Sequence, residues 1–290
     1  MKKYNLVVFS IFKNEASYLK EWIEYHRIVG VEHFYLYNNS STDNYAEELK
    51  YYIDNDIVTL IDWPGDPYKD GIDYQATSRQ HFIDNFKKDS VWGANIDLDE
   101  FIVPTEGATI PEVIEKILDR AKKKFSVLRF PFEISGICLS WLYYGTSFHK
   151  IKPEGLVLEN YLNRIDEKDN DNWCKCIYLL DNIDHIDNPH FTIQKGYLMV
   201  DEDGDIVQVM GRMCSTKCKF IRVNHYTTKS ESEHENKLDK RGFADGLRIS
   251  KEHRDLLINQ GRYQFNKVFD PITLRYVPAI KNRIKEITNT

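Results

Sequence analysis

The 290-residue sequence contains no apolar run of about 20 residues, the length that a membrane-spanning helix requires. Its first residues, Met1 to Lys3, lead directly into an apolar segment and lack the features of a cleavable signal sequence. The five cysteines are few and odd in number, which does not fit the disulfide framework of a small secreted domain. These absences lead us to expect a cytoplasmic protein.

The charge balance excludes one class of partner. The 39 lysine and arginine residues are outnumbered by 45 aspartates and glutamates, and the formal net charge is −6. Nothing in this balance favours binding to a polyanion, so we expect no nucleic-acid partner. Hydrophobic residues make up 42% of the chain, which is enough for a core. With no internal repeat in view, we expect one domain over residues 1–290.

Apolar periodicity near the N-terminus indicates alternating strands and helices. Strands are predicted at Tyr4–Phe12, His33–Tyr37 and Ile57–Ile61, with one helix between Asn14 as its cap and Gly30 as its stop, and a second at Tyr45–Ile53. This order predicts an α/β fold with a mixed, mainly parallel sheet and helices on both faces.

The later part of the sequence is less regular. We predict helices at Ile110–Lys124 and at Arg248–Gln260, the second ended by Gly261. Strands are predicted at Phe125–Ile134 and at Lys219–Val223.

Polar residues follow three of the predicted strands. They are Lys13–Glu15, Asn38–Asp43 and Asp97–Glu100, the last after the strand-like segment Val91–Ile96. Ligands of parallel sheets bind outside the carboxyl ends of the strands. We therefore expect these three segments to meet at one edge and to form a binding site.

Asp97 and Asp99 form a D-x-D motif around Leu98. In an extended segment alternate residues point the same way, so the two carboxylates would aim together and repel each other unless a cation lay between them. Mn²⁺ or Mg²⁺ suits such oxygen ligands and leaves positions open for substrate phosphates. The alternative is an acidic turn in solvent.

A predicted helix at Tyr74–Phe86 carries Gln75 and Arg79 on one side. The planar guanidinium group of arginine is well suited to phosphate oxygens. The alternative is that Arg79 is an exposed helix residue.

Motifs spread in order over about residues 5 to 245 resemble glycosyltransferase family 92 and related family 2-like enzymes. They are FSIFKNEASYLKEWIEYHRIVGVEHFYLYNNSSTD at residues 9–43, Gln75 with Arg79, DLDEF at residues 97–101, Trp141 with Tyr144-Gly145, Ser147 and His149, and Asn224-His225-Tyr226 with Lys229-Ser230, Lys237 and Arg241-Gly242. The resemblance implies a GT-A fold, a nucleotide-sugar donor and a divalent metal ion.

The resemblance also divides the chain. Residues 1–104 would form the nucleotide-sugar-binding half, residues 105–245 the acceptor side with the completion of the metal site, and residues 246–290 a C-terminal helical extension. The residues that we assign to the donor are Phe12, Asn14, Glu15, Asn38, Asn39, Asp43, Gln75, Arg79, Asp97, Leu98, Lys229 and Arg241. Lys229 and Arg241 would neutralise the diphosphate as a lid.

His225 would join Asp97 and Asp99 as the third metal ligand, because imidazole suits manganese-like ions. The alternative is a hydrogen-bonded core histidine.

The expected donor is a uridine diphosphate sugar, with UDP-galactose as one candidate. Relatives carry an aspartate where this chain has Asn38, and in related enzymes that acid accepts the N3–H of uracil. An asparagine can still accept through its amide oxygen. The acceptor would be a glycan or a lipid-linked saccharide. The family implies inversion, which needs a carboxylate base, and the candidates are Glu133 and Asp187.

Two further features have alternative interpretations. Four thiols could bind zinc, but without the usual knuckle spacing we expect buried thiols at Cys174, Cys176, Cys214 and Cys218. Three basic residues near the C-terminus could contact anionic lipid headgroups at the inner membrane face, namely Lys281, Arg283 and Lys285.

Two rival functions remain. A sugar-phosphate nucleotidyltransferase would share the sheet and the metal, but it usually carries a glycine-rich basic loop where this chain has Lys13–Glu15. A non-catalytic sugar-binding protein would not need the D-x-D motif, and metal-dependent hydrolysis of the donor separates it from an enzyme.

Overall fold

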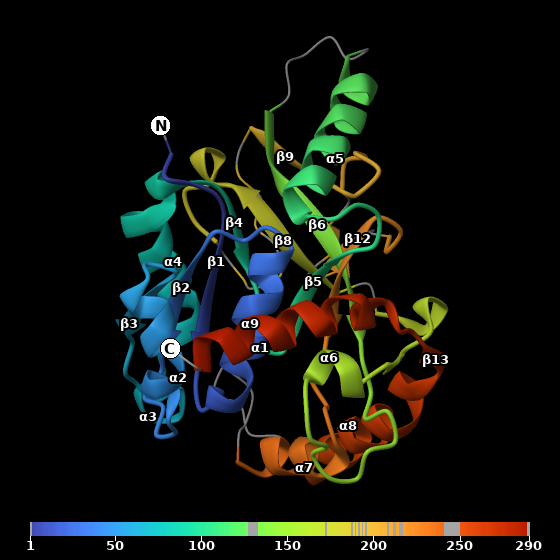
Figure 1. The fold of residues 1–290 in the computed structure, drawn as a ribbon. Helices are drawn as coiled ribbons and strands as arrows, with labels where there is room; N and C mark the ends of the chain where they lie inside the picture. Colours follow the sequence, from blue (N-terminus) through green and yellow to red (C-terminus); the bar gives the residue numbers. More distant parts are fainter. Residues whose placement is uncertain are drawn as a thin grey trace.

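The computed structural model describes residues 2–126, 133–171, 173–186, 188, 190, 192, 194, 196–207, 209–210, 213–214, 217–240 and 250–288 (Figure 1). A nine-stranded sheet forms its centre, in the order β3-β2-β1-β4-β8-β6-β12-β5, and β9 pairs with β6. Its strands are β1 (Tyr4–Phe12), β2 (His33–Asn38), β3 (Val58–Asp62), β4 (Ser90–Asn95), β5 (Glu100–Pro104), β6 (Glu133–Tyr143), β8 (Cys174–Leu179), β9 (Tyr197–Val200) and β12 (Ile221–His225).

Most strand pairs are parallel. The neighbours from β3 through β2 and β1 to β4 are parallel, as are β6 with β12 and β6 with β9. β8 is antiparallel to both β4 and β6, and β5 is antiparallel to β12. The predicted mixed, mainly parallel sheet is therefore confirmed. Its strands come both from residues 1–104 and from residues 105–245, the two parts into which the resemblance divided this region.

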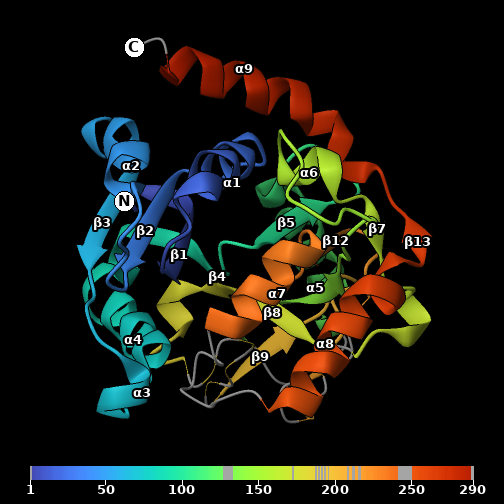
Figure 2. The same ribbon diagram turned by 90° about the horizontal axis from the view of Figure 1, so that it is seen from below.

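Helices cover both faces of the sheet (Figures 1 and 2). They are α1 (Ala16–Ile28), α2 (Tyr45–Asp54), α3 (Pro67–Asp70), α4 (Tyr74–Phe86), α5 (Ile110–Phe125), α6 (Val157–Asn160), α7 (Glu231–Lys240), α8 (Lys251–Tyr263) and α9 (Val277–Thr288). Short two-residue strands lie outside the main sheet: β7 (Asn163–Arg164) pairs with β13 (Val268–Phe269), and β10 (Val209–Met210) with β11 (Met213–Cys214).

The apolar sequence of β1 is explained by burial on both faces. Leu6 and Val8 belong to the core that contains Trp22 of α1, whereas Val7 packs in a second core with Phe82 of α4. Successive residues of a strand point to opposite faces, so a strand between two helical layers must be apolar throughout.

The predicted segments in the first 86 residues agree with the structure to within one residue at each strand end, and α4 has the predicted bounds. The predicted cap of α1 was wrong. Glu15 precedes the helix, and Asn14 has a left-handed φ of 57°. An aspartate or asparagine tolerates this conformation better than other non-glycine residues, and here it turns the chain out of β1.

Gly261 does not end a helix, because α8 continues to Tyr263. A Cβ atom at position 261 would lie 2.6 Å from Cγ2 of Thr228. The glycine therefore permits a close approach of α8 to the segment after β12. Part of the predicted strand Phe125–Ile134 lies outside the described residues, and β6 begins at Glu133.

The C-terminal residues pack back on the core. Ile280 of α9 is fully buried in the core that also contains α1. Lys281 pairs with Glu159 and Arg283 approaches Glu24, so two of the three basic residues considered for lipid contact already face carboxylates. Among the described residues, no helix is long and apolar enough to cross a membrane.

Candidate active site

The carboxyl ends of β1, β2 and β3 lie side by side, with Phe12, Asn38 and Asp62 in register. The next residue, Asn39, donates its backbone amide to the carbonyl of Phe12 (2.8 Å) and its side-chain amide to the carbonyl of Trp63 (2.9 Å). These bonds join three strand ends into one continuous edge.

Cross-links between the loops after β1 and β2 complete this edge. The Asn14 side-chain oxygen accepts a hydrogen bond from the amide of Thr42 (2.7 Å), and the amide of Asn14 donates to Oγ of Ser41 (3.0 Å). Asp43 accepts from the amide of Ala16 (2.8 Å). Asn14 and Asp43 therefore position the two loops relative to each other at the start of α1.

Asp97 and Asp99 lie in the turn between β4 and β5. The amide of Asp97 donates to Oε2 of Glu100 (2.9 Å), and the amide of Glu100 donates to the carbonyl of Asp97 (3.0 Å). Our expectation of an extended segment with both carboxylates aimed together was wrong. The turn directs Asp97 to Lys175 and Asp99 to His225.

Lys175 was missed in the sequence, although it holds the acidic turn together. Its side chain is 2% exposed, and Nζ lies 3.1 Å from Oδ2 of Asp97 and 3.1 Å from Oε2 of Glu100. Burial raises the pKa of Glu100 to about 8, with Lys175 opposing that shift. Burial alone would lower the pKa of Lys175, but the two carboxyl groups raise it. The lysine therefore stays charged and compensates the acidic turn.

Asp99 lies between two basic groups. Its Oδ2 lies 2.6 Å from Nζ of Lys237 on α7, and its Oδ1 lies 3.4 Å from Nε2 of His225 at the end of β12. Burial alone would raise the pKa of Asp99, but these neighbours hold it well below its usual value. Asp99 is therefore an anion over the whole physiological pH range.

His225 is fixed by an aromatic wall. Its ring lies 4.3 Å from the ring of Trp141 and 5.6 Å from that of Tyr143, centroid to centroid. Burial lowers the pKa of His225, which keeps the imidazole neutral. The buried Nδ1 has no hydrogen-bond partner among the described residues. The alternative of a core histidine with both ring nitrogens hydrogen-bonded is therefore not supported.

Asp99 and His225 fit a divalent cation as a pair of ligands. Their facing atoms are 3.4 Å apart, close to the roughly 3 Å between neighbouring ligands of an octahedral ion with bonds of about 2.1 Å. A neutral imidazole and an ionised carboxylate are also the required protonation states. In the described part of the chain, Asp97 does not join them in a group whose ligand atoms all lie within 4.8 Å of one another.

Arg79 is buried rather than exposed, which excludes the alternative of a solvent-facing helix residue. It is 3% exposed, and its Nε has no hydrogen-bond partner among the described residues. Burial lowers the pKa of Arg79, while Asp73, Tyr178 and Asp97 oppose that shift. A buried Nε without a hydrogen bond is costly, so its retention favours an anionic ligand. Gln75 lies half-buried one turn earlier on α4.

Lys229 lies beside Glu15 at the start of α1. Its Nζ is 3.8 Å from Oε2 of Glu15 and 3.7 Å from the ring centroid of Tyr18. Burial lowers the pKa of Lys229, and Glu15 opposes the shift. Lys229 has a left-handed φ of 50°, a conformation that is unfavourable for lysine and is found at functional sites more often than elsewhere.

Other predicted site residues do not present their side chains at this edge. The side chains of Phe12 and Leu98 are almost fully buried in the core, at 3% and 4% exposure. Glu133 begins β6, whereas Tyr143 at the other end of that strand pairs with His225. A strand of this length spans roughly 33 Å, so Glu133 is too far away to act as a base there. Asp187 and Arg241 lie outside the described residues.

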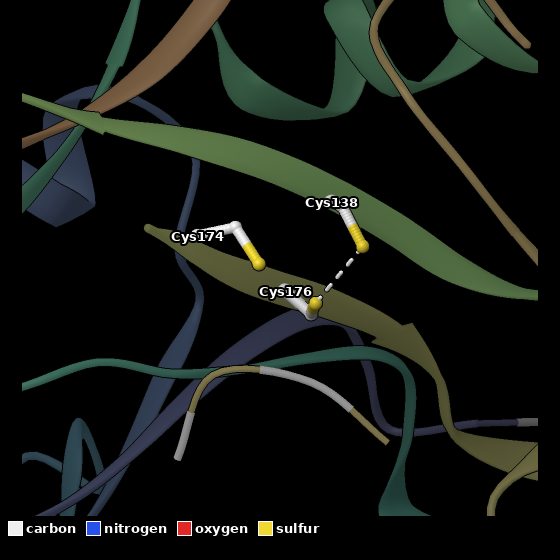
Figure 3. A group of neighbouring side chains, drawn as sticks. All are labelled: Cys138, Cys174 and Cys176. Atoms are coloured by element: carbon white, nitrogen blue, oxygen red, sulfur yellow. Dashed lines mark hydrogen bonds between the residues drawn. The ribbon is translucent and has the colours of Figure 1, made fainter. Parts of the chain in front are cut away.

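The four cysteines considered for zinc do not meet in one group among the described side chains, and the expected free thiol at Cys174 was wrong. Figure 3 shows the sulfur atoms that do meet, those of Cys138, Cys174 and Cys176, and Cys138 lies 3.3 Å from Cys176. Cys174 is disulfide-bonded, and Cys218 instead contacts Oγ of Ser140 (3.4 Å). Cys138 and Cys176 are buried free thiols, as expected of ordinary core cysteines. The side chain of Cys214 is outside the described residues.

The sequence model of glycosyltransferase family 92 matches residues 7–241. The chain belongs to glycosyltransferase family 92. The match covers β1, the acidic turn and β12, and it ends before α8 and α9. The resemblance that the motifs indicated is therefore confirmed.

Named relatives of family 92 are similar over part of their length. A family 92 protein of Ricinus communis is 28% identical over 200 residues, 67% of this chain and 32% of that protein. The β-1,4-galactosyltransferase galt-1 of Caenorhabditis elegans is 26% identical over 256 residues, 85% of this chain and 53% of that protein. The chain thus spans between a third and about half of these relatives.

Among solved structures, TarS of S. aureus (residues 1–349) in complex with UDP is similar with a TM-score of 0.37 and 11% identity. The comparison covers 88% of this chain and 69% of that chain.

Proposed function

We propose that this family 92 protein transfers a sugar from a nucleotide diphosphate donor to a saccharide acceptor. The observation that carries the proposal is the pairing of an ionised Asp99 with a neutral His225 at the carboxyl edge. Arg79, whose buried Nε has no hydrogen-bond partner among the described residues, adds to it. An anionic ligand with a divalent cation satisfies all three groups at once.

The chain's own residues have distinct roles in this reaction. Asp99 and His225 would hold Mn²⁺ or Mg²⁺, which when bound supplies positive charge to the departing diphosphate. Arg79 and Lys229 bind diphosphate oxygens and stabilise the negative charge that develops on the leaving group. Lys175 holds Asp97 in place at the donor side through their ion pair. Arg241 belongs to the same proposal as a lid residue.

We further propose a uridine diphosphate sugar as the donor, with UDP-galactose tested first because the C. elegans relative is named a β-1,4-galactosyltransferase. A glycan or a lipid-linked saccharide is the proposed acceptor, and inversion at the anomeric carbon follows from the family resemblance. A nucleotidyltransferase is less well supported, because Asn14 ties the loop after β1 to the loop after β2 and no glycine-rich phosphate loop follows β1.

The test is release of UDP from UDP-galactose by the purified protein, with Mn²⁺ or with a chelator, in the presence of a panel of glycan acceptors. We expect metal-dependent UDP release that acceptor sugars accelerate. Asp99→Asn should abolish it, and Asp54→Asn, which alters an exposed carboxylate on α2, should not. A protein that binds UDP but turns over no nucleotide sugar would be a sugar-binding protein instead.

A further inference from the structure

Asn38 has little capacity left for a ligand. Its Nδ2 donates to Oη of Tyr45 (2.9 Å) and to Oδ1 of Asp62 (3.2 Å), and its Oδ1 accepts from the amide of Ser41 (2.9 Å). The side chain cannot flip, because the Ser41 amide needs an acceptor and Asp62 needs a donor. Asn38 is 6% exposed, so it acts as a bracket between β2, α2 and β3 rather than as a free recognition group.

Asp62 is the group that this bracket presents to solvent. It ends β3, lies in register with Asn38, and is exposed. Asn38 occupies Oδ1 only, and Asp62 makes no ion pair with any described residue. The other aspartates of this edge are less available: Asp97 and Asp99 pair with lysines, and Asp43 accepts a backbone amide through Oδ2 while its Oδ1 is buried. Asp62 therefore offers a charged acceptor in a fixed orientation.

The chemistry of the base decides what such an acceptor selects. Uracil presents an N3–H donor between two carbonyl groups, whereas cytosine presents a bare nitrogen acceptor at the same position. An ionised carboxylate can only accept hydrogen bonds, so it binds the N–H of uracil and repels the lone pair of cytosine. Bases bind outside the carboxyl ends of such strands, which is where Asp62 lies.

We propose that Asp62, held by Asn38, accepts the N3–H of the uracil base and thereby sets the donor preference of this chain. The inference rests on the proposed function, since it assumes a nucleotide at this edge. The proposal places recognition of the uracil base at the end of β3, whereas the sequence had placed it at Asn38.

The experiment uses UDP, N3-methyl-UDP and CDP, titrated by calorimetry into the wild-type protein with Mn²⁺. Methylation removes the one hydrogen that Asp62 would accept. The wild type should bind UDP about ten- to a hundredfold more tightly than either of the other two, which is the range of a charge-assisted hydrogen bond. In Asp62→Asn that preference should largely disappear. The amide oxygen introduced by this substitution can still accept from Asn38, so the bracket and the melting temperature should persist.

Asp54→Asn is the matched control, with the same charge change on an exposed carboxylate of α2. It should retain the full preference for UDP over N3-methyl-UDP. An unchanged preference in Asp62→Asn overturns the inference while leaving the proposed function intact. A wild-type protein that binds none of the three nucleotides overturns the proposed function and the inference with it.

Discussion

Replacing Lys175 with methionine should destabilise the free protein, because it leaves two carboxyl groups without their buried cation. Truncating one partner of a buried ion pair costs about 3–5 kcal/mol. Two features reduce this cost: the Asp97 side chain is 39% exposed and can be hydrated, and Glu100 can bind a proton because burial raises its pKa to about 8. We therefore expect a loss of about 2–3 kcal/mol near pH 7, or a melting temperature lower by about 4–10 °C.

The dependence on pH follows from the raised pKa of Glu100. A group whose pKa rises on folding contributes stability below its unfolded pKa and loses it as the pH rises through the folded pKa. For the wild type this window runs from the ordinary value of 4.5 to about 8. Without Lys175 the pKa of Glu100 rises further. The loss of folding stability then continues to higher pH. The difference in stability between the variant and the wild type should therefore widen from pH 6 to pH 9.

Thermal unfolding of Lys175→Met and of the wild type at pH 6, 7.5 and 9 measures this pH dependence of stability. Lys281→Met is the control, because Lys281 pairs with Glu159 at the surface with 52% of its side chain exposed, and such pairs contribute about 0–1 kcal/mol. Equal losses at pH 6 and pH 9, or a loss no larger than that of the control, would refute the role of Lys175. Adding Glu100→Gln to Lys175→Met should restore stability at pH 9.

Three further outcomes are expected. His225→Ala should raise the Mn²⁺ concentration needed for UDP release, and His225→Asn should raise it less. An unaltered Mn²⁺ requirement in a folded His225→Ala protein would show that His225 is not a metal ligand and that Asp99 binds the ion without it. Arg79→Met should weaken UDP binding about tenfold or more in calorimetry yet raise the melting temperature, because it removes a buried Nε that has no hydrogen bond. Lower stability with normal UDP affinity would contradict this. Gly261→Ala should destabilise the protein by about 1–3 kcal/mol through the contact with Thr228, measured by urea unfolding, and a neutral result would show that α8 can shift.

The first half of the fold could be predicted because each segment carries its own signal. Tyr4–Phe12 is apolar on both faces, and α4 is bounded at its start by Asp73, whose side chain accepts from the amide of Ala76. Periodicity and turn residues are local properties, so they are visible without knowledge of the partners. The convergence of the loops after β1 and β2 followed from the parallel order of the strands.

Side-chain direction at the acidic turn could not be predicted in the same way. The D-x-D motif predicted an extended segment, but the bonds between Asp97 and Glu100 close a turn in which the two carboxylates have different partners. Lys175 did leave a sequence signal: it is a single lysine between Cys174 and Cys176 in an otherwise apolar strand. A buried lysine needs a counter-charge, so this pattern indicates a paired acid elsewhere in the chain.

Strand direction explains both the missed lysine and the wrong choice of Glu133. The rule that site residues follow strands holds only where the strands are parallel. β8 runs antiparallel to β4 and β6, so its beginning, with Lys175, lies at the edge where their carboxyl ends lie. β5 likewise begins at that edge with Glu100, opposite His225. β6 is parallel to β12, so its beginning, with Glu133, lies at the far edge. In a mixed sheet the starts of antiparallel strands therefore contribute to the site as much as the ends of parallel ones, and their direction is set by pairing between segments far apart in the chain rather than by any local pattern.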